Sequence, residues 1–167
     1  MIGLYKGKSL VSSIIKFRTW GVYSHASWIC DDGRVYEAWM NGGVRCENDF
    51  HEGHTPGTEI DIFNPGFTSE QIRTVEGYLA RQVGKKYDFA GVLGFFSRTA
   101  ILKNVDPTPT EADAMAAAIN AWFCSDLVFA ACQAAGRPPL VRVPWYKVSP
   151  TVLSYSPELI YIQTVTT

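Results

Sequence analysis

The stretch "AWFCSDLVFAACQAAG", residues 121–136, places a cysteine at the start of an apolar helix pattern. Gly136 is a stop signal, and the "RPP" that follows cannot continue a helix. The first turn of a helix favours negative charge, because its N–H groups lack intrahelical partners and the macrodipole is positive there. Cys124 is therefore either a nucleophile at a helix N-terminus or a small apolar core residue, which is the usual role of an isolated cysteine.

The composition is that of one globular domain spanning residues 1–167, with 47% hydrophobic and 19% charged residues. The net charge of −1 gives no indication of a nucleic-acid partner. Four cysteines are too few and too scattered for a disulfide framework, which favours a reducing compartment. The N-terminus has no uninterrupted apolar run and no small-residue cleavage site, and no segment is as long as a membrane span. We therefore expect a cytoplasmic protein.

Helix and strand patterns are mixed without a regular alternation, which favours the α+β class. Helices are expected at 9–17 with Ser9 as cap, at 67–84 with Thr68 and Gln71 as a capping box, at 87–97, after Thr110, and at about 123–136. Strands are expected at 22–30, 34–39, in "GVRCEN" (43–48), at 58–63 and at 158–165. The segment 97–120 has the character of an insertion or lid.

A nucleophilic cysteine needs a base, and His25 lies in the first of two strand patterns joined by "DDG". Glu37, on the second strand, is the candidate that would orient it. If the loop is the three residues Asp31–Gly33, residue 27 faces 37, and His25 and Glu37 are diagonal neighbours on one face. A two-residue turn would shift the register by one and send Glu37 to the other face. We expect the three-residue loop, with Gly33 in a left-handed conformation; the alternative for His25 is a satisfied histidine on an exposed sheet face.

The segments "YSHASWI", "DGRVYEAW", "GKKYDF", "WFCSDLV" and "VSPTVLSYSPEL" follow one another in an order that resembles the circularly permuted NlpC-type papain-like cysteine hydrolases, the YiiX-like group. The resemblance implies a Cys-bearing helix packed on an antiparallel sheet or half-barrel. It also implies Cys124 as nucleophile, His25 as base and Glu37 as orienter, with Tyr87 and Ser125 near the substrate or oxyanion. The implied activity is hydrolysis of an amide bond through an acyl-enzyme, with peptidoglycan peptides as the expected substrate, and without cofactor or metal. Without a leader, the chain resembles the short versions of phage or prophage genomes, which would be released at lysis.

Three other functions stay open at this stage. A lipid acyltransferase or thioesterase would use the same chemistry, with an acyl pocket lined by aromatic residues, although such residues are more often core: Trp28, Trp39, Phe95, Phe96, Trp122 and Phe123. "CENDFHEGH" brings Cys46, His51 and His54 close in sequence, but the spacing is not that of a zinc site. The third alternative is a non-catalytic binding protein with an inert Cys124, and the oligomeric state is left open.

Overall fold

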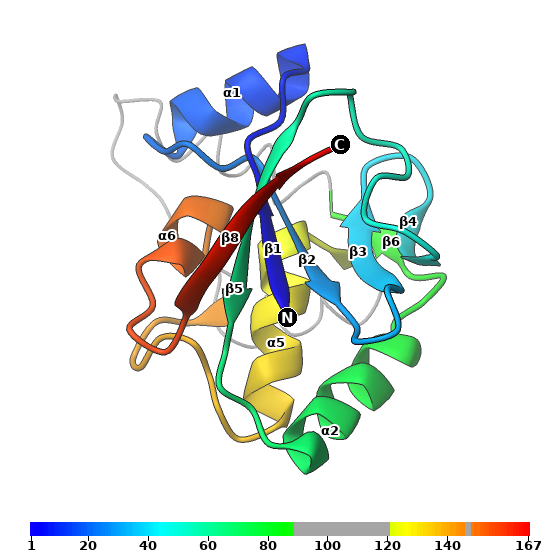
Figure 1. The fold of residues 1–167 in the computed structure, drawn as a ribbon, viewed down its shortest axis with the longest axis vertical. Helices are drawn as coiled ribbons and strands as arrows, with labels where there is room; N and C mark the ends of the chain where they lie inside the picture. Colours follow the sequence, from blue (N-terminus) through cyan, green and yellow to red (C-terminus); the bar gives the residue numbers. More distant parts are fainter. Residues whose placement is uncertain (89–120, 146–147) are drawn as a thin grey trace, which may run out of the picture.

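A six-stranded antiparallel sheet forms the centre of the molecule (Figure 1). The computed structural model describes residues 1–88, 121–145 and 148–167. The strand order is β4-β3-β2-β1-β5-β8, with β1 Ile2–Tyr5, β2 His25–Ile29, β3 Val35–Trp39, β4 Gly43–Glu47, β5 Glu59–Asn64 and β8 Ile160–Thr166. The described helices are α1 Leu10–Arg18, α2 Ser69–Ala80, α5 Cys124–Ala134 and α6 Pro150–Ser154. A short parallel pair, β6 Lys86–Tyr87 and β7 Ala121–Trp122, completes the described elements, and the mixture confirms the α+β class.

The hairpin of β2 and β3 has the register that the three-residue loop requires. Ser27 faces Glu37, and the Cys30 N–H donates to the carbonyl of Arg34 at 2.8 Å. Gly33 has a φ of 90°, which a residue without Cβ adopts at little cost. The predicted register is therefore confirmed, and it places His25 and Glu37 on one face of the sheet.

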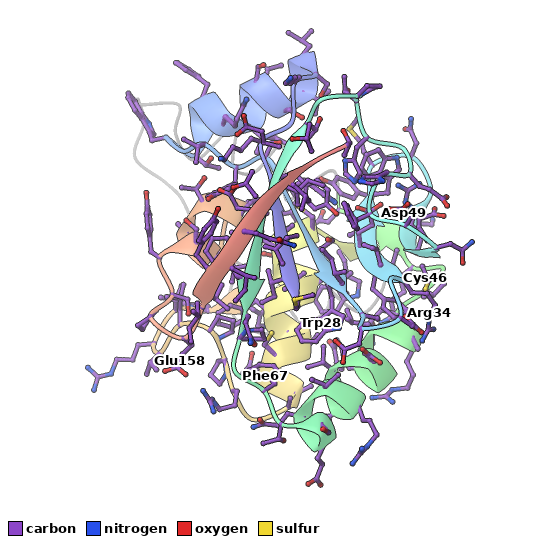
Figure 2. All side chains as sticks on the ribbon, in the orientation of Figure 1. Trp28, Arg34, Cys46, Asp49, Phe67 and Glu158 are labelled. Carbon is purple, nitrogen blue, oxygen red and sulfur yellow. The ribbon has the colours of Figure 1, made fainter. Side chains whose placement is uncertain are left out.

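Helix α5 lies against the sheet on the face opposite to Glu37, behind β1 and β2 in Figure 1. Its buried side chains, among them Leu127 and Phe129, belong to one core cluster with Ala26 and Trp28 of β2. Helix α2 closes the same core with Val75 and Leu79. Figure 2 shows Trp28 in the interior close to Phe67, and their ring centroids are 6.0 Å apart. This packing fixes the position of the N-terminus of α5, where Cys124 lies.

The predicted helix caps are confirmed, whereas one helix end and several short elements differ from the prediction. Ser9 and Thr68 cap α1 and α2, and Thr68 forms the predicted capping box with Gln71. Helix α2 ends at Ala80, before the predicted residue 84, and the following turn closes at Gly84 with a φ of 87°. Strand β1, the strand β7 and helix α6 were not predicted, because segments of two to five residues give little periodic signal.

The predicted helix at 87–97 is wrong at its first residue, since Tyr87 belongs to β6 and pairs with Trp122 of β7. The remainder of that segment, the helix after Thr110 and the insertion at 97–120 lie outside the described residues. None of the described helices has the length and hydrophobicity needed to cross a bilayer.

Candidate active site

Glu37 is a buried carboxylate in contact with His25. It is 1% exposed, and its Oε2 lies 2.5 Å from Nε2 of His25. The two side chains meet because they are diagonal neighbours across β2 and β3. Burial alone would keep a carboxyl group neutral, so ionised Glu37 needs several partners.

Arg45 and His54 supply these partners. Arg45 faces Glu37 directly across β3 and β4, and donates from Nε and Nη2 to Oε1 at 2.9 and 2.5 Å. Nε2 of His54 lies 3.5 Å from Oε2. Burial opposes the charge of Glu37, but the positive charge of His25 and hydrogen bonds from both histidines hold its pKa well below the usual range. Glu37 is therefore an anion at neutral pH.

Aromatic rings enclose the two histidines. The His54 ring stacks on Tyr5 with centroids 4.2 Å apart, and Tyr5 also meets His25 edge-on at 5.0 Å. Trp39 contacts both histidine rings edge-on, and the guanidinium of Arg45 lies 4.3 Å from its centroid. The low polarity of this enclosure strengthens the charge interactions inside it. For His54 burial is the main effect, and its pKa is lowered.

Cys124 lies beside His25, although the two residues belong to helix α5 and to the sheet, respectively. It is the first residue of α5, and it lies close enough to His25 for the two groups to influence each other's charge. Burial lowers the pKa of His25, but the charges of Cys124 and Glu37, with the hydrogen bond to Glu37, raise it to about 10. Because Nε2 contacts Glu37, Nδ1 is the nitrogen left to meet the sulfur. The structure thus brings the three residues of the predicted triad close together.

Among the described residues, no side chain caps the first-turn N–H groups of α5. Phe123 is the N-cap residue and makes no side-chain capping hydrogen bond. The hydroxyl of Ser125 is occupied, because it donates to the carbonyl of Val148 at 2.5 Å. Ser125 can therefore contribute to an oxyanion site through its backbone N–H, whereas its hydroxyl anchors the helix to residue 148.

Two further ionisable groups lie beside Cys124. Burial raises the pKa of Tyr87, and the negative charges of Cys124, Asp126 and Asp88 add to the effect. Burial, followed by Cys124 and Asp88, raises the pKa of Asp126 well above its usual value, and its Oδ1 has no hydrogen-bond partner among the described residues. A neutral Asp126 repels a thiolate less than the ionised residue would.

Sequence reasoning missed Arg45 altogether, and it placed His54 in a different group. The metal-site alternative joined His54 to Cys46 and His51, which the structure separates. Cys46 faces Tyr36 across β3 and β4, and it lies on the other face of the sheet from Arg45 because side chains alternate along a strand. Figure 2 shows Cys46 at the periphery. His51 instead pairs with Asp49 at 3.2 Å. The sequence could have revealed Arg45 as a positive charge directly opposite Glu37 in a second hairpin. That pairing can be derived only if the length of the "MNGG" turn is known, because the turn sets the register of β3 and β4.

Within the described residues, the potential metal ligands that lie close together are His25, Glu37 and His54. One ligand atom of each lies within 4.8 Å of the others. The two imidazoles and the carboxylate match the kind and number of protein ligands in catalytic zinc sites. Arg45 occupies Oε1, so Oε2 is the oxygen directed at both histidines.

No protein-family profile and no curated protein sequence matches this chain. Among solved structures, the crystal structure of the metalloprotein yiiX from Escherichia coli is similar, with a TM-score of 0.65. The match covers 97% of this chain and 94% of that chain at 18% sequence identity. At this identity the likeness establishes a shared fold. The predicted YiiX-like character is therefore confirmed for the fold.

Proposed function

We propose that this protein is a cysteine hydrolase of the circularly permuted NlpC type that cleaves amide bonds, with Cys124, His25 and Glu37 as its triad. The observation that carries the proposal is that His25 contacts Glu37 at 2.5 Å and lies beside Cys124, within the range of its charge. A cysteine with a base, and a base with an orienting carboxylate, is the general arrangement of nucleophilic catalysis.

In the proposed mechanism, His25 takes the proton of Cys124, and the thiolate attacks the carbonyl carbon of the substrate. A C–S bond forms and the carbonyl oxygen becomes an oxyanion, which the first-turn N–H groups of α5 stabilise. His25 then gives its proton to the leaving nitrogen, and the C–N bond breaks. Water, deprotonated by His25, hydrolyses the resulting thioester and restores the thiol.

Glu37 would hold His25 in one orientation and stabilise its cationic form during the reaction. Tyr87, at the end of β6, lies close enough to Cys124 to be influenced by its charge, which makes it a candidate contact for the substrate. The residue types do not identify the acyl group, because a triad defines a reaction and leaves the substrate open. Peptidoglycan peptides are our first choice, and acyl lipids are the alternative for the same chemistry.

Thiol labelling tests the nucleophile. Cys46 is exposed and Cys124 is 1% exposed, so accessibility alone predicts that Cys46 reacts first with iodoacetamide. We expect Cys124 to react faster than Cys46 near neutral pH, as measured by peptide mass spectrometry, because a thiolate paired with His25 is the reactive form. His25→Ala should slow Cys124 and leave Cys46 unchanged. An unreactive Cys124 beside a labelled Cys46 would contradict the proposal.

A substrate screen tests the reaction. Muropeptides, peptide amides and acyl lipids are incubated with the wild-type protein, with Cys124→Ala and with Cys132→Ala as a matched control. Cys132 is also buried in α5, away from the site. Turnover should disappear in the Cys124 variant and persist in the control. Turnover by both variants would remove Cys124 from the mechanism.

Metal binding by His25, Glu37 and His54 is a second candidate function. It is favoured by the convergence of their ligand atoms and by the description of the structural neighbour as a metalloprotein. A bound zinc ion would supply Lewis acidity there and lower the pKa of a bound water. The contact of 2.5 Å between His25 and Glu37 would have to lengthen, because ligands of a tetrahedral zinc ion are separated by roughly 3.3 Å.

Metal content distinguishes the two candidates. After incubation with Zn²⁺ and removal of free metal, elemental analysis should find zinc in the wild-type protein and in Cys124→Ala, and little in His54→Ala. His51→Ala is the matched control, since His51 lies outside the cluster. Equal zinc in the His54 and His51 variants, or none in the wild type, would exclude this site.

A further inference from the structure

Helix α1 turns its apolar side chains away from the protein. Leu10 is 78% exposed and Phe17 is 72% exposed, and Val11 and Ile14 are exposed beside them. Their spacing of one, four and seven residues from Leu10 places them along one helical face. The half-buried side of the helix holds Ile15 together with polar groups such as Lys16, whose Nζ donates to the carbonyl of Gly7 at 2.8 Å. In a helix that serves only the core of its own domain, this orientation would be reversed.

Trp20 extends this face at an energetic cost. It follows the C-cap residue Thr19 and has a φ of 48°, a position where glycine is preferred. The turn closes with a hydrogen bond from the Gly21 N–H to the carbonyl of Lys16 at 3.0 Å. The Trp20 side chain is 85% exposed, so burial within the chain does not offset the backbone strain. Its ring stacks on Phe17 with centroids 6.1 Å apart.

Charge accompanies this apolar face. Residues 1–30 contain the basic residues Lys6, Lys8, Lys16 and Arg18 and no Asp or Glu, in a chain whose net charge is −1. Lys6 is paired with Glu59 and Asp61, whereas Lys8 is exposed. The segment that contains α1 therefore carries basic residues without acidic ones, and Lys8 just before the helix is exposed.

We propose that Leu10, Val11, Ile14, Phe17 and Trp20, here called the α1 surface, insert into the headgroup region of an anionic lipid bilayer. Aliphatic and aromatic side chains on one face with lysines beside them are the pattern of helices that lie in the membrane interface. Anionic lipids attract the lysines, and the aromatic rings favour the headgroup level. The absence of acidic residues from this part of the chain favours lipid over a basic protein partner.

The α1 surface is tied to the candidate active site by a short, packed segment. Gly21 lies against Thr151 of α6, and the N–H of Tyr23 donates to the Thr151 hydroxyl at 3.2 Å. His25 follows two residues later at the start of β2. Membrane attachment through α1 would therefore hold the candidate site close to the bilayer. The binding proposal itself does not depend on the hydrolase proposal.

Vesicle sedimentation tests the proposal. The full chain is mixed with vesicles of phosphatidylcholine alone or of phosphatidylcholine with phosphatidylglycerol, at low and high salt. We expect binding to the anionic vesicles that weakens with salt, and about tenfold weaker binding for Leu10→Ser combined with Phe17→Ser. Val141→Ser is the matched control, because Val141 is 79% exposed outside the α1 surface. Lys8→Glu should weaken binding to anionic vesicles and leave the fold intact.

Two results would overturn the proposal. One is absence of sedimentation with anionic vesicles by a wild-type protein whose circular dichroism and melting are normal. The other is a dimer in light scattering that the Leu10 and Phe17 variant abolishes, since the α1 surface would then contact a second copy. Rapid labelling of Cys124 in the same variant would show that the candidate active site is unaffected, which separates this test from that of the proposed function.

Discussion

Arg45 donates two N–H groups to a single oxygen of Glu37, Oε1, and so leaves Oε2 to His25. The pair is cross-strand, with Glu37 directly opposite Arg45 in β3 and β4. A guanidinium is planar and rigid, so it fixes the rotation of the carboxylate as well as neutralising it. Arg45 therefore helps to set the orientation of His25 through Glu37, although Arg45 itself takes no part in the proposed reaction.

Replacing Arg45 with lysine should separate charge from orientation. Arg45→Lys keeps the positive charge but loses the fixed pair of donors, so we expect labelling of Cys124 by iodoacetamide to slow by about tenfold. Arg34→Lys is the control, because Arg34 pairs with the exposed Asp32 outside the site. Unchanged labelling in Arg45→Lys would show that charge alone is sufficient.

The hairpin loop should be sensitive to a side chain at Gly33. A branched residue resists a φ of 90°, so Gly33→Val should lower the free energy of unfolding by about 1–3 kcal/mol, measured by denaturant titration. Gly33→Asn should cost clearly less, since asparagine tolerates left-handed conformations. Equal losses for both variants would mean that the conformation of the loop is not the cause.

The stability of the protein should depend on Asp61 in a pH-dependent way. Asp61 accepts hydrogen bonds from Tyr23 at 2.5 Å and from Thr164 at 2.6 Å, and pairs with Lys6 at 3.1 Å. Burial alone would raise its pKa, but these three partners lower it below the usual 3.8. The stabilisation is therefore complete above pH 3.8 and is lost as the pH falls through the lower pKa of the folded state.

Asp61→Asn tests this dependence. At neutral pH the variant should be less stable than the wild type by about 1–3 kcal/mol, because the amide cannot replace an anion that accepts from three groups. The difference should shrink in thermal melts below about pH 4, where the Asp61 carboxylate of the unfolded wild type begins to be protonated while that of the folded state is still ionised. A difference that is constant with pH would assign the effect to packing.

The contact between Gly21 and Thr151 should not tolerate a methyl group. A Cβ at Gly21 would lie 2.0 Å from the Thr151 hydroxyl oxygen, which also accepts from the Tyr23 N–H. Gly21→Ala should therefore destabilise the protein by about 1–3 kcal/mol in denaturant titration. Gly77→Ala is the control for added volume, because its Cβ position has only an ordinary contact, with Arg81 at 3.7 Å, and its φ is not in the left-handed region. Gly21→Ala with wild-type stability would contradict the close contact.

The sequence alone determined the features that depend on neighbours in the chain. The caps at Ser9 and Thr68 follow from local geometry, because the N–H groups of the first helical turn need acceptors. For the hairpin, the sequence limited the register to two loop lengths, and the structure has the odd one, which keeps His25 and Glu37 on one face. Cys124 at the start of its helix belongs to the same class of inference.

Tertiary structure decided the rest, because no local rule brings distant segments together. The loop after β4 folds back and delivers His54 to Glu37, and the packing of α5 against β2 brings Cys124 to His25. β1, too short to recognise in the sequence, is stabilised between β2 and β5 at the centre of the sheet. The outward turn of α1 is also a tertiary result, since periodicity reveals an apolar face but not the direction it takes relative to the core.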